Sequence, residues 1–192
     1  MTESQWNESE NAILMLEFVF DVRGIRSDST RHRMGYRLNS GVVETDTKFE
    51  TAMHRFYIAC CRRIWPLLPD KESRNGVEVA EQWLDGHLSD SALNECDYHV
   101  EGAAFGIDYK SSPDELGGWI SIVDAIPEPE LNSLLSSHNA DRPDSYQLLK
   151  SAAYFAHYAI MYPAMNPKGI PPENYHQFLS AELLRQQIKY AA

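Results

Sequence analysis

Three cysteines and one histidine are the residues of this chain whose types best fit a metal site. Cys60 and Cys61 are adjacent, and Cys96 forms a C-x-x-H pair with His99. Thiolate and imidazole groups are the ligands of structural zinc, so these four side chains could complete a tetrahedral set if their helices pack face to face. Adjacent residues of a helix point about 100° apart, however, and two such cysteines seldom reach one ion. We therefore interpret the cysteines first as buried thiols that pack like small apolar side chains.

A second candidate metal site uses His54, His99 and His157, each on a different predicted helix. Glu95 comes one helical turn before His99, which puts the two side chains on one helix face. Helical bundles build metal and acid–base sites from inward-pointing residues of this kind. A metal-binding or metal-dependent hydrolase-like bundle, with Glu95 and Cys96 as further ligands, is therefore our alternative hypothesis. Lone histidines on amphipathic helices are more often hydrogen-bonded residues at the edge of the core.

The adjacent arginines Arg62 and Arg63 are a third candidate, because guanidinium groups can hold a phosphate or the carboxylate of a partner. The simpler interpretation is that they bridge to Glu78 or Glu81 on the next predicted helix and fix the turn between the helices. Asp85 lies one helical turn after Glu81, so these two acids could face a cation. These five residues are candidates for contact with a partner.

No nucleophile, general base or phosphate-binding loop occurs in a spacing that is typical of an enzyme. We therefore expect no catalytic residues and no cofactor. The N-terminal MTESQWNESEN is polar and acidic, unlike a signal peptide, and no apolar run approaches the roughly 20 residues of a membrane span. Three cysteines, two of them adjacent, do not form a typical disulfide framework. We expect a cytoplasmic protein that makes no membrane contact.

The net charge of −11 is distributed unevenly over the 192 residues. Residues 1–74 hold 11 Lys or Arg and 11 Asp or Glu, so residues 75–192 hold the other 6 of the 17 bases and the other 17 of the 28 acids. Charge of this kind governs solubility and association more than fold. The excess of acid over the second part of the chain therefore favours a partner protein with a basic surface.

Two segments are candidate contact regions on these grounds. Residues 78–130 hold Lys110 as their one base, and an arginine cluster that includes Arg31 and Arg33 lies in a short polar stretch nearer the N-terminus. Double-stranded nucleic acid is disfavoured as a partner, because the bases are few and neighbouring acids dilute most of them.

Apolar residues recur at spacings of three and four along most of the chain, which is the pattern of amphipathic helices. We predict an all-α fold, an irregular antiparallel bundle of about six to seven helices in a single domain over residues 1–192. Residues 21–47, rich in Gly, Ser and Arg, are expected to be a non-helical insertion that could form a β-hairpin. Residues 163–172 are expected to be a linker before the last helix.

The ends of several helices can be placed from their capping residues. Thr2 and Gln5 have the form of a capping box at the start of a first helix that continues to about Phe20. A buried helix from Phe49 is predicted to end near Pro66, since proline disfavours helical geometry at the residue before it. Asp70 can cap the helix that follows. The final helix is expected from Tyr175 to Ile188.

Three stretches carry a resemblance to a known family. The chain has MTESQW and then MLEF near its start, ACCRRIWPLL from Ala59, and SRNGVEVAEQWLDG from Ser73. These resemble the MTE..W, MLEF, ACCRRIW.LL and SR.AVEVAE..ADG motifs of a family of bacterial proteins that often occur as several paralogues in one genome. The resemblance implies a helical fold and carries no established activity. This chain departs from the family by its long segment 21–47, where the relatives have a short basic connector.

Taken together, these observations predict a non-enzymatic protein-interaction or regulatory module with an acidic surface. The alternative is the metal-binding bundle described above. The two hypotheses differ in whether the histidines converge on one point in the folded chain.

Overall fold

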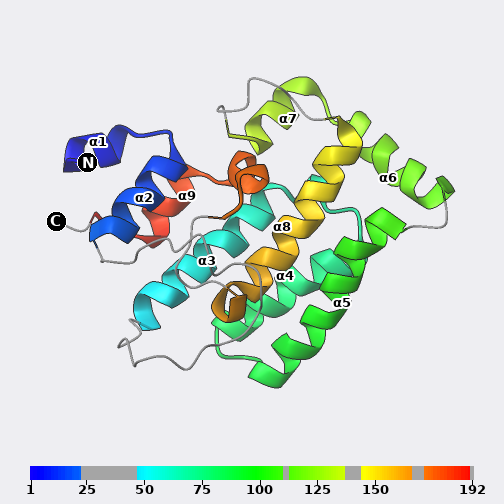
Figure 1. Cartoon of the computed structure of the whole chain (residues 1–192), viewed down its shortest axis with the longest axis horizontal. Helices are drawn as coiled ribbons and strands as arrows, with labels where there is room; N and C mark the ends of the chain where they lie inside the picture. Colours follow the sequence, from blue (N-terminus) through cyan, green and yellow to red (C-terminus); the bar gives the residue numbers. More distant parts are fainter. Residues whose placement is uncertain (23–46, 110–112, 137–143, 166–170, 191–192) are drawn as a thin grey trace.

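The structure is a computed structural model, and it describes residues 1–22, 47–109, 113–136, 144–165 and 171–190. All regular elements in these ranges are helices, which confirms the predicted all-α fold (Figure 1). In chain order, with η for a 3-10 helix, they are α1 (Glu3–Glu8), α2 (Ala12–Val22), α3 (Thr47–Arg63), η1 (Trp65–Leu67), α4 (Lys71–Leu84), α5 (Asp90–Tyr109), α6 (Pro113–Asp124), α7 (Glu128–Leu134), α8 (Ser145–Met165), η2 (Glu173–Phe178) and α9 (Ala181–Gln187).

One of the predicted segments falls mostly outside the described residues, and a second falls half outside them. Residues 23–46, which make up most of the expected insertion at 21–47 and include Arg31 and Arg33, lie outside the described residues. Residues 166–170 of the expected linker at 163–172 also lie outside the described residues. The start of that linker is helical instead, because α8 continues past Pro163 to Met165. The hairpin and the arginine cluster therefore remain predictions.

The N-terminal segment forms two helices instead of the single helix that was expected. The capping box is present, because Thr2 Oγ1 accepts a hydrogen bond from Gln5 N at 3.2 Å while Thr2 N donates to Gln5 Oε1 at 2.8 Å. Asn11 then starts α2, since its Oδ1 accepts hydrogen bonds from Ile13 N and Leu14 N at 3.0 and 3.1 Å. A second capping side chain thus separates α1 from α2.

The turn between α3 and α4 follows the prediction from proline. Trp65 and Pro66 lie in the short helix η1, and Asp70 caps α4 by accepting a hydrogen bond from Glu72 N at 2.7 Å. Gly86 follows α4 with φ of 76°, a left-handed conformation that glycine adopts without steric cost. Local residue chemistry therefore sets both ends of α4.

Helix α8 lies against α3, α4 and α5 in the middle of the molecule (Figure 1). Its buried side includes Ala152, Ala156 and Ala159, and small side chains of this kind let neighbouring helices approach closely. Tyr57 and Phe155 are among the largest fully buried side chains, and their rings meet edge to face at 6.4 Å. One cluster of buried apolar residues extends from the N-terminal helices to α9.

Helices α1, α2 and α9 lie on the same side of the molecule (Figure 1). The rings of Trp6, Phe18 and Tyr190 pack together there, with Phe18 and Tyr190 stacked at 5.6 Å. Arg185 of α9 donates hydrogen bonds to the carbonyls of Trp6 at 3.3 Å and Ser9 at 2.6 Å. These contacts hold α1 and α2 against α9.

The expected last helix is also divided. Its first part is the 3-10 helix η2 and its second part is the α-helix α9. Ser180 separates the two and caps α9 by accepting a hydrogen bond from Leu183 N at 3.3 Å. Across the described ranges, no helix combines the length and the apolar character that crossing a membrane requires.

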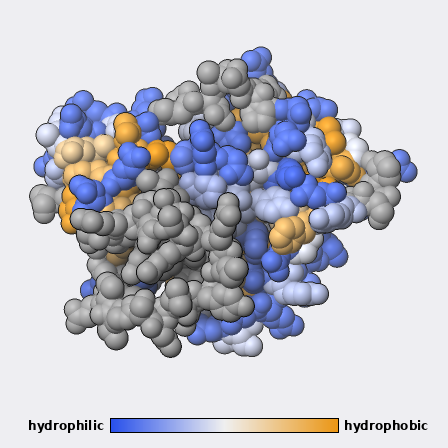
Figure 2. Space-filling view, in the orientation of Figure 1, coloured by the Kyte–Doolittle hydropathy of each residue, from blue (hydrophilic) through white to orange (hydrophobic). Residues whose placement is uncertain are grey.

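On the face drawn in Figure 2, the largest hydrophobic group lies over the N-terminal helices, and smaller ones lie near α6 and right of the centre, within a mainly hydrophilic surface. Leu14 and Val22 of α2 and Ile122 of α6 are among the large apolar side chains that are exposed.

Candidate functional site

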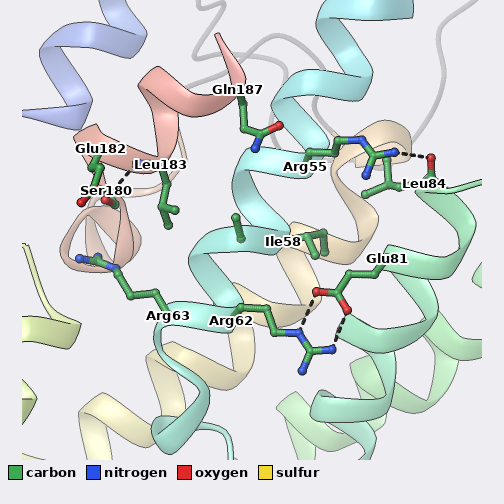
Figure 3. Close-up of a pocket in the computed structure, with 11 residues that line it drawn as sticks. Arg55, Ile58, Arg62, Arg63, Glu81, Leu84, Ser180, Glu182, Leu183 and Gln187 are labelled. Atoms are coloured by element: carbon green, nitrogen blue, oxygen red, sulfur yellow. Dashed lines mark hydrogen bonds and ion pairs between the residues drawn. The ribbon is translucent and has the colours of Figure 1, made fainter. Parts of the chain in front are cut away.

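A pocket of about 570 Å³ lies between α3, α4 and α9, and its lining includes Arg62, Arg63 and Glu81 from the candidate contact residues of the sequence (Figure 3). Three arginines of α3 line it, and the apolar residues Ile58 and Ala59 lie between the first arginine and the other two along the helix. The other side of the pocket comes from α4 and α9. Its lining residues are Arg55, Ile58, Ala59, Arg62, Arg63, Glu81, Leu84, Ser180, Glu182, Leu183 and Gln187.

Arg62 pairs with Glu81, as the sequence predicted. Its Nε and Nη2 donate to the two carboxylate oxygens of Glu81 at 2.7 and 2.6 Å (Figure 3). Its Nη2 also lies 3.8 Å from an oxygen of Glu78. The guanidinium also lies 4.2 Å from the centre of the Trp65 ring. Because the carboxylate neutralises the arginine and accepts from both nitrogens of its Nε–Nη2 edge, this pair acts mainly as a link between α3 and α4.

Asp85 has its partner on α3 as well. Arg55 Nη1 lies 2.9 Å from Asp85 Oδ1, and Arg55 Nη2 donates to the carbonyl oxygen of Leu84 at 2.7 Å. Arg55 therefore satisfies an end carbonyl of α4 and pairs with the residue that follows it. Three of the predicted contact residues, Glu78, Glu81 and Asp85, are thus engaged by arginines of the same chain.

Arg63 is different, because no carboxylate of the described residues pairs with it. Its Nη2 donates to the backbone carbonyls of Phe178 at 3.0 Å and Leu179 at 3.2 Å, and its Nε is buried. Burial lowers the pKa of the Arg63 guanidinium below its ordinary value. Figure 3 shows the side chain directed toward Ser180 and Glu182.

The histidines do not converge. His54 is buried beside Trp83 with ring centres 5.4 Å apart, His157 lies 3.2 Å from a carboxylate oxygen of Asp97, and His99 is exposed on α5. Over the described ranges, no three His, Cys, Asp or Glu side chains are grouped so that they could hold a metal ion. The proposed set of His54, Glu95, Cys96, His99 and His157 is therefore not assembled, because its members face different neighbours.

All three cysteines are free and buried, which agrees with their interpretation as packing residues. Burial raises the pKa of the Cys60 thiol to about 12 and raises that of Cys61 well above its ordinary value. Burial also raises the pKa of Cys96, whose sulfur lies 3.8 Å from Asn75 Nδ2. Thiols held in the protonated form are poor nucleophiles and poor metal ligands.

A surface on α5 was missed by the sequence analysis. Tyr98, Phe105 and Tyr109 are exposed by 74%, 45% and 81%, although large aromatic side chains are usually more buried. At about 100° per residue, these three positions lie within about 40° of one another around the helix axis. We call this stripe the aromatic face of α5. Its signal in the sequence is the spacing of seven and four residues between the aromatic positions.

The aromatic face is bordered by acid and by open space. Glu95 and Glu101 lie on opposite sides of it, about 60° away around the axis. A Cβ atom at Gly102 or Gly106 would meet no atom within 4 Å, so the backbone of α5 can be approached closely there. Helix α5 itself contains no Lys or Arg.

Two acids of α5 are engaged by residues of α8. Asp97 faces His157, and Asp108 pairs with Lys150 at 2.5 Å and accepts a hydrogen bond from Tyr154 at 2.9 Å. The Lys150 contact, with the hydrogen bonds from Tyr154 and Tyr146, lowers the pKa of Asp108 below its ordinary value. These pairs fasten the inner side of α5 and leave Glu95 and Glu101 as the acids beside the aromatic face.

Comparisons with known proteins found no match to the chain among protein-family models, curated proteins or solved structures. The motif resemblance therefore transfers no activity or site to this chain.

Proposed function

We propose that this protein is a non-enzymatic interaction module whose aromatic face of α5 binds a basic amphipathic helix of a partner protein. The observation that carries the proposal is the exposure of Tyr98 and Tyr109, 74% and 81%, on a helix that has acids and no Lys or Arg. Aromatic side chains dominate the binding energy of many protein interfaces, and charge complementarity increases the rate and selectivity of association.

The chemistry of the partner follows from the neighbours of the aromatic face. Apolar side chains of a helix would pack on Tyr98, Phe105 and Tyr109, and the open positions at Gly102 and Gly106 would let its backbone come near. Lys or Arg residues at the edges of that helix would face Glu95 and Glu101. Helix-in-groove recognition uses such apolar anchors spaced by helical turns.

The test is the binding of two designed helical peptides that share an apolar leucine face. One peptide carries lysines on its other face and the second carries glutamates, and fluorescence anisotropy measures their affinity for the protein. We expect the lysine peptide to bind and the glutamate peptide not to bind. The affinity for the lysine peptide should fall as salt is added, because ions screen exposed charges beyond about 10 Å at 0.1 M.

The double variant Tyr98→Ser with Tyr109→Ser should weaken binding of the lysine peptide by about tenfold or more, since loss of an interface anchor typically costs over 1 kcal/mol. The matched control is Leu14→Ser with Val22→Ser, which removes two exposed apolar side chains from α2. Equal binding of both peptides, or loss of affinity in the control instead of the tyrosine variant, would count against the proposal.

A further inference from the structure

We infer that the pocket between α3, α4 and α9 is a binding site for a small monocarboxylic acid, with Arg63 as the residue that pairs with the carboxylate. This inference goes beyond the interaction proposed for α5 and does not depend on it. It starts from the charge balance of the pocket, in which Arg55 and Arg62 are neutralised by Asp85 and Glu81 and Arg63 is not.

Arg63 is held ready for an anion by the backbone. The carbonyls of Phe178 and Leu179 both accept from Nη2, which fixes the plane of the guanidinium, and no described residue accepts from Nη1. Carbonyl oxygens satisfy hydrogen bonds but supply no net negative charge. A half-buried cation in this setting gains more from an added carboxylate than a solvated arginine does, because the surrounding dielectric is lower.

The remaining lining selects the rest of the ligand. Ile58, Ala59 and Leu183 offer apolar surface within reach of the same pocket, which suits a short hydrocarbon chain. Glu182 also lines it, and its charge opposes a second negative charge on the ligand. A singly charged carboxylate with an apolar body therefore fits this pocket better than a doubly charged phosphate.

The probe for this site is hexanoate, and the direct readout is the ¹H–¹⁵N signal of Arg63 Nε in protein labelled with ¹⁵N. Hexanoate should shift this signal saturably with a dissociation constant of about 1 to 10 mM, the range that a ligand of this size reaches. Hexanol, hexylammonium and inorganic phosphate serve as controls, and each lacks either the single negative charge or the apolar chain.

Two charge-changing variants test the site without touching Arg63. Gln187 lines the pocket and the neighbouring Gln186 does not, so Gln187→Glu should weaken hexanoate binding about threefold or more while the control Gln186→Glu leaves it unchanged. Glu182→Gln removes an acid from the pocket and should strengthen binding. Neither the length nor the branching of these side chains changes, so the fold is expected to survive.

The inference is overturned if hexanoate gives no saturable shift of the Arg63 signal, or if hexanol shifts it equally. It is also overturned if Gln187→Glu and Gln186→Glu have the same effect on the affinity. Binding of inorganic phosphate with higher affinity than hexanoate would contradict the assignment of the ligand class.

Discussion

At the scale of single residues, Arg62 and Arg63 show how neighbours with the same side chain take different roles. Arg62 makes an exposed ion pair with Glu81, an interaction that typically contributes about 0 to 1 kcal/mol to stability. Arg63 donates to two backbone carbonyls from a less exposed position, and hydrogen bonds that involve a charged group contribute about 1.5 to 3 kcal/mol. We infer that Arg63 attaches η2 and the start of α9 to α3, whereas Arg62 links α3 to α4.

The sequence predicted the pairing of Arg62 and the burial of Cys60, because both follow from helix periodicity and from the acids on the next helix. It could not predict the partners of Arg63, since the two carbonyls lie more than 100 residues further along the chain. It also could not show that His54 and His99 face different neighbours. That result depends on helix rotation, which periodicity fixes only approximately.

His54 gives a prediction for the pH dependence of stability. Burial lowers its pKa from 6.5 to about 4, with the charge of Arg55 as a smaller contribution, and the side chain is 1% exposed. The unfolded chain therefore binds a proton that the folded protein does not bind between about pH 6.5 and pH 4. The free energy of unfolding should fall as the pH falls through this window, by roughly 3 kcal/mol from this residue.

The measurement is urea unfolding of the wild type and of His54→Gln at a series of pH values. Near pH 7 the contribution of His54 is fully present, and the variant should show a smaller loss of stability than the wild type on going to about pH 4. Parallel pH profiles for the two proteins would contradict the buried neutral histidine.

Gly76 gives a second prediction at this scale. A Cβ atom there would lie 2.3 Å from Val100 Cγ2 and 2.6 Å from Ile160 Cδ1, so α4, α5 and α8 meet at this glycine. Gly76→Ala should destabilise the protein by about 1 to 2 kcal/mol, because overpacking outweighs the gain in helix propensity. Gly118→Ala is the matched control, since nothing lies within 4 Å of its Cβ, and thermal unfolding should show it unchanged or more stable. A stabilising Gly76→Ala would be the contrary result.

At the scale of helices, local capping chemistry was the most predictable part of the structure. The capping box at Thr2 and the cap at Asp70 were expected from their sequence and are present. The division of the expected first and last helices was not predicted. Asn11 and Ser180 cap helices there, although the helical spacing of apolar residues continues on both sides of each cap. A cap competes with helix continuation, and tertiary packing of the two pieces decides the outcome.

Arg185 links elements that are far apart in sequence, and its loss should act locally. Arg185→Gln removes a charged donor to the carbonyls of Trp6 and Ser9, which end α1. Hydrogen exchange measured by mass spectrometry should become faster in α1 and the start of α2, while α4 and α5 keep their protection. The control is Gln186→Ala on the exposed side of α9. Uniformly faster exchange across the whole chain would show that the contact is not local.

At the scale of the whole molecule, the all-α class followed from periodicity, whereas the surface for a partner did not. The sequence indicated an acidic region over residues 78–130 and did not single out the aromatic residues of α5 within it. Which aromatic residues remain outside depends on where α4 and α8 cover α5, and this is a property of packing. Exposure of Tyr98 and Tyr109 could therefore be seen only in the folded chain. The single-domain organisation over 1–192 stays a prediction.

The most direct measurement of the central claim is a map of where the lysine-bearing peptide binds. Protein labelled with ¹⁵N would be titrated with this peptide, and the amide shifts would be followed along the whole chain. The account predicts that the largest shifts lie in α5 between Glu95 and Tyr109 and that added salt reduces them. Shifts concentrated in α1 and α2, or the absence of any saturable shift in α5, would contradict the account.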